Sequence, residues 1–169
     1  MAGTNWIDLL VRQSAPDLPV GWDEVVVGHD FGILGPEEIR CWAQTQAVQG
    51  PHCRALVALA DTGLEGFEEA LWAACAEAVG KVPRPGERRW SRAQDRWRLA
   101  LLKEAMVAPL SSEALAVAVE SIYERVGCPE DMLGLWHRHS PWQGLQGGAD
   151  HQAIVRFVKR CETDLLAAV

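Results

Sequence analysis

Three side chains of this 169-residue sequence are the best candidates for chemistry: Cys128, His137 and His139. Nucleophilic catalysis needs a serine or cysteine that a histidine activates. Cys128 lies between Gly127 and Pro129 at an expected helix start, where the helix dipole would favour a thiolate. The sequence has no Gly-x-Ser-x-Gly elbow for a serine nucleophile, and no papain-like or caspase-like pattern surrounds Cys128. We therefore expect a capping or packing role for Cys128 and no enzymatic activity.

The histidines do not form a metal-binding pattern. His137 and His139 are two positions apart, so on a helix they would point to different faces and chelate one ion poorly. The other three, His29, His52 and His151, are scattered. No Gly-Lys-Ser/Thr phosphate loop occurs. We expect neither a metal nor another cofactor.

A basic run in the middle of the chain resembles a nucleic-acid patch, because arginines contact phosphates and aromatic rings stack on bases. Its tryptophans are Trp90 and Trp97, and its bases are Lys81, Arg84, Arg88, Arg89, Arg92, Arg96, Arg98 and Lys103. Three interpretations stay open: internal pairing with acidic helices, contact with a protein partner, and nucleic-acid binding.

The rest of the chain is acidic. The net charge is −7, with more acids than bases on both sides of the basic run. An acidic surface repels nucleic acid and attracts cationic partners, although it also keeps a protein soluble. If the surface binds a partner, we expect these acids to contribute: Asp23, Glu24, Asp30, Glu37, Glu38, Glu65, Glu68 and Glu69. Of the eight tryptophans, we expect most in the core and Trp142 and Trp6 as exposed anchors.

Length and composition indicate one soluble domain. A chain of this size buries enough surface to fold without disulfides. The five cysteines are odd in number and widely spaced, which favours buried free thiols and a reducing compartment. No apolar run approaches the length of a membrane span, and residues 1–13 do not resemble a secretion signal. We therefore expect a cytoplasmic protein.

Apolar residues recur at helical spacing, and strand-like alternation is nearly absent. We expect helices over about 36–49, 51–60, 67–79, 91–108, 112–126 and 129–140, and a last helix capped by Asp150. Ser111 or Ser112 should cap the fifth of these, and Gly127 should end it. The run Val25–Val27 suits either a short strand or a helix.

The expected fold is therefore all-α, a single compact domain over residues 1–169. A Pro- and Arg-rich loop at 81–90 divides an N-terminal helical group, 1–80, from a C-terminal group, 91–169. A stack of helical hairpins is one arrangement that would satisfy this pattern. We find no internal repeat of fixed period.

Three stretches carry a family resemblance: Gly21-Trp22-Asp23-Glu24-Val25 followed by Gly28 and Gly32-Ile33-Leu34; Trp97–Lys103; and Ile122–Met132. In this order and spacing the chain resembles an uncharacterised bacterial family, domain of unknown function 2247. The chain departs from the family at His139-Ser140-Pro141, where the family tends to have Tyr-Met-Pro, and in its basic insert at 81–92.

The resemblance implies a small helical domain, and some relatives serve as immunity proteins that neutralise a toxin made by the same cell. Together with the acidic surface, it leads us to expect an immunity-type protein that binds a cognate bacterial toxin, such as a basic nuclease. The alternative is a nucleic-acid-binding or regulatory adaptor that uses the Arg/Trp-rich segment 81–103.

Overall fold

The computed structural model describes residues 5–13, 18–49, 54–107, 110–137 and 148–167. As the periodicity predicts, the fold is all-α. The described elements are, in order, α1 Trp6–Gln13, α2 Trp22–Asp30, α3 Pro36–Gln49, α4 Arg54–Asp61, α5 Phe67–Val79, α6 Arg88–Val107, α7 Ser112–Arg125, a 3₁₀ turn η1 Glu130–Met132, strands β1 Trp136–His137 and β2 Gly148–Ala149, and α8 His151–Ala167.

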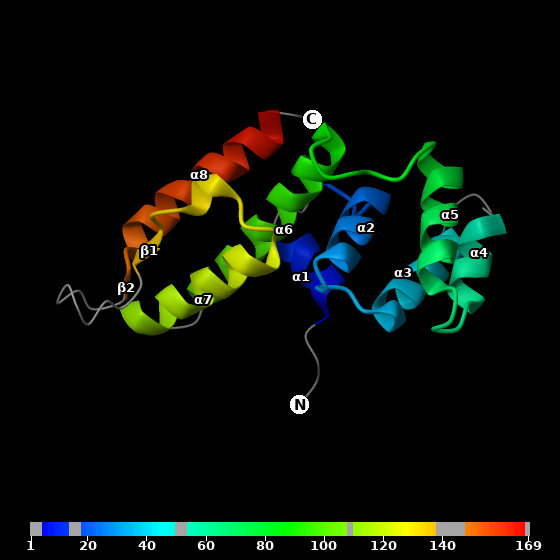
Figure 1. Ribbon diagram of the computed structural model, residues 1–169, viewed down its shortest axis with the longest axis horizontal. Coiled ribbons are helices and arrows are strands. Elements are labelled where there is room, and N and C mark those ends of the chain that lie inside the picture. The colour runs from blue at the N-terminus through cyan, green and yellow to red at the C-terminus, as the bar shows by residue number, and fades with distance from the viewer. Residues whose placement is uncertain (1–4, 14–17, 50–53, 108–109, 138–147, 168–169) are drawn as a thin grey trace.

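The longest helix, α6, is the central support of the fold. It contacts α1, α2, α7 and α8. Figure 1 shows it in the middle of the molecule, with α7 and α8 toward one end and α3, α4 and α5 toward the other. Every side chain from Arg96 to Leu102 is buried. A charged side chain on the buried part of such a helix needs an ion-pair or hydrogen-bond partner within the core.

Helix α2 packs closely on α6 because Gly28 has no side chain. A Cβ at Gly28 would lie 2.7 Å from Cζ2 of Trp97, which is fully buried. The Trp97 indole N–H donates a 2.8 Å hydrogen bond to the carbonyl oxygen of Glu24. Val25–Val27 are fully buried within α2, so the helical interpretation of this run is confirmed and the strand is wrong.

A buried ion pair joins the same two helices. Nη1 of Arg96 donates to Oε1 of Glu24 at 2.8 Å, and the two side chains are 3% and 11% exposed. Arg96 also donates to the carbonyl oxygens of Leu18 and Pro19. The other Glu24 oxygen accepts from the N–H of Gly21 at 2.9 Å. One network therefore fixes α6, the start of α2 and the segment that precedes it.

Helices α3, α4 and α5 extend the core away from α6. Their predicted apolar faces are buried at Ile39, Trp42 and Ala43, at Leu56 and Leu59, and at Phe67, Leu71, Ala74 and Cys75. Ala78 continues the apolar spacing of α5 but is exposed, as is the rest of the last turn from Ala76 to Gly80. The expected start of α4 at Pro51 lies outside the described residues.

Helix α1 was not among the predicted elements. Leu9 and Leu10 are fully buried within it, and it packs against α6. The sequence does carry a start signal apart from its periodicity: the side-chain oxygen of Asn5 accepts a 3.2 Å hydrogen bond from the N–H of Asp8 and so caps the helix.

The predicted caps of the C-terminal half are confirmed. The Ser111 hydroxyl accepts from the N–H of Ala114, and Gly127 follows α7 with a left-handed φ of +83°. Asp150 accepts from the N–H of Gln152 at the start of α8.

The helix predicted from Pro129 onward is wrong. The chain makes one 3₁₀ turn and reverses at Gly134, whose φ is +92°. Trp136 and His137 then pair antiparallel with Ala149 and Gly148. This pairing competes with helix formation, and the Ser112 hydroxyl reinforces it by hydrogen bonds to the backbone of Ala149 at 3.0 and 3.1 Å. The apolar residues Met132, Leu135 and Trp136 are nevertheless buried.

A second buried arginine holds this half together. Arg98 on α6 donates to Asp131 at 2.6 Å and pairs with Asp95 at 3.0 Å. Its guanidinium also lies 5.3 Å from the ring centre of Phe157 on α8. Arg98 therefore links α6, the turn after α7, and α8.

The contact between Gly28 and Trp97 predicts a specific packing defect. We expect Gly28→Ala to lower the free energy of unfolding by about 1–3 kcal/mol, because the added methyl group overpacks a rigid interface. Chemical denaturation measures this. Gly63→Ala is the matched control, since a Cβ there meets no atom within 4 Å. An equal change in both variants would contradict the close α2–α6 contact.

The buried ion pair predicts a larger loss. We expect Glu24→Ala to cost about 3–5 kcal/mol in unfolding free energy, because Arg96 would stay buried without its carboxylate. Glu124→Gln replaces an exposed acid and should change stability by less than about 0.5 kcal/mol. A loss below about 1 kcal/mol for Glu24→Ala would show that water reaches Arg96.

Candidate protein-binding surface

Two of the acids expected at a partner surface hold helix N-termini. Glu24 accepts from the N–H of Gly21, and Glu38 accepts from the N–H of Gly35 at 3.2 Å. Glu38 also accepts from the N–H of Trp6 at the start of α1. A glutamate at the third position of a helix commonly accepts a hydrogen bond from the backbone N–H of the N-cap residue in this way. The repeated Gly-x-x-Glu spacing was the sequence signal for this role.

The basic run is engaged mainly within the molecule. Arg89 pairs with Asp23 through a 2.8 Å hydrogen bond from Nε, and Arg96 pairs with Glu24. Other pairs are Lys81–Glu87, Arg98–Asp131 and Lys103–Glu162. Trp90 and Trp97 are buried and cannot stack on bases. Of the three interpretations of the run, these contacts favour internal pairing.

The other expected acids, Asp30, Glu37, Glu65, Glu68 and Glu69, lie exposed. Glu37 pairs with Arg40, and a Glu68 oxygen lies 3.8 Å from Nε2 of His29. No ion pair involves Glu65 or Glu69 within the described part of the chain. Although Asp30 is exposed, desolvation by nearby protein atoms raises the pKa of its carboxyl. His29 lowers this pKa and the negative charge of Glu68 raises it, and the net shift is upward.

Three of these exposed acids, Glu65, Glu68 and Glu69, lie at one end of the molecule. Residues 54–80, which include α4 and α5, carry five acids and one base. Figure 1 places the two helices side by side at the end opposite α7 and α8. The carboxylates of Glu65, Glu68 and Glu69 therefore leave exposed negative charge at this end of the molecule.

An exposed tryptophan lies among these acids. Trp72 on α5 is 42% exposed, and Glu68 and Glu69 are one helical turn before it. Side chains on a helix lean toward the preceding turn, so the indole of Trp72 is expected on the side of the turn that carries these two glutamates. Together we call Glu65, Glu68, Glu69 and Trp72 the acidic tryptophan patch.

Trp72 was not singled out from the sequence, which placed most tryptophans in the core. The buried face of α5 follows Phe67, Leu71, Ala74 and Cys75, and Trp72 lies off this face. The spacing could therefore have identified it. Trp6 is half-buried, with the guanidinium of Arg125 at 5.8 Å from its ring centre. Trp142 lies outside the described residues.

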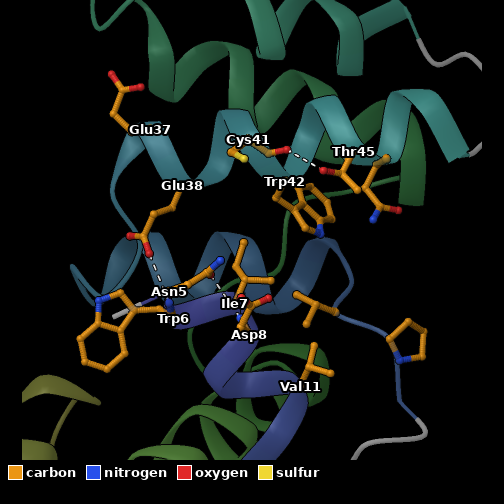
Figure 2. Close-up of a pocket in the computed structure, with 13 residues that line it drawn as sticks. Asn5, Trp6, Ile7, Asp8, Val11, Glu37, Glu38, Cys41, Trp42 and Thr45 are labelled. Carbon is orange, nitrogen blue, oxygen red and sulfur yellow. Dashed lines mark hydrogen bonds between the residues drawn. The ribbon is translucent and has the colours of Figure 1, made fainter. Parts of the chain in front are cut away.

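A groove of about 900 Å³ opens between α1 and α3 (Figure 2). Glu38 joins the two helices at one end, through its hydrogen bond to Trp6. Cys41 and Thr45 of α3 lie across from Ile7 and Val11 of α1. Trp42 contributes to the wall and packs edge-on against Trp22 at 4.9 Å between ring centres. The apolar lining is completed by Trp6, Pro19 and Val20.

The charged residues that line this groove are all acids: Asp8, Glu37 and Glu38. Glu38 is committed to two helix N-termini, and Glu37 pairs with Arg40 and points away from the groove in Figure 2. Asp8 is exposed, and no ion pair to its carboxylate occurs in the described ranges. Asp8 is therefore the acid best placed to contact a cation beside the groove.

The candidate chemical residues do not converge in the described structure. Cys128 is exposed in the turn between α7 and η1, with a φ of +57°. The expectation that Cys128 starts a helix is wrong, because the chain makes only η1 there. His137 belongs to β1, and His139 and His52 lie outside the described residues. No group of three or more potential metal ligands occurs among the residues described.

The cysteines are free thiols where the structure describes them. Cys75 and Cys161 are buried, as expected, whereas Cys41 faces the groove and is exposed. Burial raises the pKa of the Cys75 thiol to about 11, and the charge of Asp23 adds to this effect. Burial also raises the pKa of the Cys161 thiol.

Comparisons with known proteins give no assignment. No protein-family model matches the chain, and neither the curated proteins nor the solved structures contain a significant match. The resemblance to domain of unknown function 2247 therefore stays a prediction. In the part of the chain that the structure describes, no helix combines the length and apolar character needed to cross a membrane.

Thiol accessibility gives a direct check of the groove and the core. At pH 8 we expect iodoacetamide to modify Cys41 and Cys128 rapidly in the folded protein. Cys75 should stay unmodified, because it is buried and its pKa of about 11 keeps it protonated. Peptide mass spectrometry after digestion reports each site. Modification of Cys75 as fast as Cys128 would contradict the packing of α5.

Proposed function

We propose that this protein is a non-catalytic, immunity-type inhibitor that binds a basic bacterial toxin through the acidic tryptophan patch. The observation that supports it best is Trp72, an exposed aromatic side chain beside Glu68 and Glu69. Tryptophan is enriched among the residues that dominate binding energy at protein interfaces. The resemblance to a family with immunity proteins agrees with this role.

Charge gives the patch its preference for a partner. A toxin that cuts nucleic acid needs cations to bind phosphates, and the carboxylates of Glu65, Glu68 and Glu69 would pair with such cations. An arginine could also stack its guanidinium on the indole of Trp72. Blocking the toxin's phosphate-binding surface would require no chemistry from the inhibitor.

We place this interaction in the cytoplasm. The described cysteines are free thiols, which fits a reducing compartment. An inhibitor stored beside a toxin must bind quickly, and opposite charges raise association rates in a salt-dependent manner.

The test is binding and protection with the toxin encoded beside the gene. Wild-type protein should bind the purified toxin and protect cells that express it. We expect Trp72→Ala to weaken binding by at least about 2 kcal/mol, and the triple variant Glu65→Gln, Glu68→Gln, Glu69→Gln to slow association and reduce its salt dependence. Association and dissociation rates can be measured by surface plasmon resonance.

A matched triple variant separates local from overall charge. Glu113→Gln, Glu124→Gln, Glu130→Gln removes three exposed acids from α7 and η1, with the same change in net charge. It should retain fast association if the patch is the binding surface. Equal effects of the two triple variants, or no binding by the wild type, would refute the proposal.

A further inference from the structure

The groove between α1 and α3 is a second surface that the acidic tryptophan patch does not include. Its apolar lining comes from α1, α3 and the segment before α2, so three parts of the chain build it. It is open to solvent along its walls, because Asn5, Val11, Cys41 and Thr45 are all exposed. An apolar groove of this kind, among the residues that the structure describes, suits an incoming side chain or helix face.

We propose that this groove binds a basic amphipathic segment of a partner protein, with apolar side chains between α1 and α3 and a lysine or arginine at Asp8. This proposal is independent of the proposed toxin-binding function, since it uses different helices.

The shape of the groove favours a peptide over a small molecule. Its volume of about 900 Å³ is near the upper limit for small-molecule pockets, which run from about 300 to 1,000 Å³. Such pockets bury most of their ligand, whereas this groove exposes residues on both walls. A helix or extended segment can lie in an open groove and keep its polar side in water.

The groove keeps its shape because its two walls are fixed separately. Leu9 and Leu10 anchor α1 in the core beneath the exposed Val11, and Ile39, Trp42 and Ala43 anchor α3. The walls are joined at the Glu38 end by the backbone of Trp6. A ligand would therefore meet a preformed site and lose little free energy to reordering it.

Charge identifies the class of partner. The lining residues include no lysine or arginine, and the carboxylate of Asp8 has no ion-pair partner in the described ranges. Arg12, a cation on the same helix, donates from Nε to the backbone carbonyl oxygen of Asp8 at 3.3 Å. An acidic peptide would place like charges together, as would a second copy of this acidic chain. A segment that carries lysine or arginine beside its apolar face would match both the apolar lining of the groove and the negative charge of Asp8.

Two synthetic helical peptides test the proposal. Both carry the same leucine and phenylalanine face, but one has lysines on its polar face and the other has glutamates. We expect the lysine peptide to bind the full-length protein at least about tenfold more tightly, by isothermal titration calorimetry. We also expect it to protect Cys41 from iodoacetamide and to leave Cys128, which does not line the groove, as reactive as before.

Variants of exposed groove residues locate the binding. Asp8→Asn should weaken binding of the lysine peptide by up to about tenfold. Val11→Arg, which adds a cation and bulk to the groove, should weaken its binding by more than that. Val117→Arg is the control, because it makes the same substitution at an exposed valine on α7. Circular dichroism would check that each variant is folded.

The proposal is overturned if the two peptides bind equally, if Cys41 is not protected, or if Val11→Arg binds as well as Val117→Arg. A failure of this kind leaves the toxin-binding proposal intact, because that proposal is tested at Trp72. Loss of toxin binding by Trp72→Ala would likewise leave the peptide result unchanged.

Discussion

The buried pairing of Glu24 with Arg96 is the interaction on which the rest of the structure depends. It joins α2 to α6 at the point where Gly28 lets the helices approach and Trp97 fills the contact. Two charges that are removed from water must be matched closely, so this pair fixes the relative position of the helices. Helix α6 then supports α1, α7 and α8, while α2 contacts α5.

The same pairing explains how a chain with a strongly basic segment presents an acidic surface. Arg89, Arg96 and Arg98 find carboxylate partners within the fold. Acids distant from this segment, above all those around α5, keep their charge at the surface. The basic segment is therefore neutralised in the centre of the molecule, and the acids outside it leave negative charge at one end. Both binding proposals follow from this distribution, each at an apolar feature beside exposed carboxylates.

Much of the fold could be predicted from local signals. Helical spacing identified α3 to α8, and Ser111, Gly127 and Asp150 marked helix ends because capping depends on a few adjacent residues. The helix expected after Pro129 failed, since the pairing of Trp136 with Ala149 joins residues far apart in sequence. The candidate site was predicted less well. Glu24 and Glu38 were taken as surface acids, although their spacing from Gly21 and Gly35 indicates capping.

An all-α fold, its main helices and an excess of acid outside one basic run can be predicted from the sequence, because these properties depend on composition and short-range periodicity. The folded arrangement of the helices was needed to show which charges are neutralised, that Trp72 and Cys41 are exposed, and that α1 and α3 leave a groove between them. The physical reason is that ion pairing and burial depend on which helix faces meet. The residues involved, such as Glu24 and Arg96, are brought together only by folding.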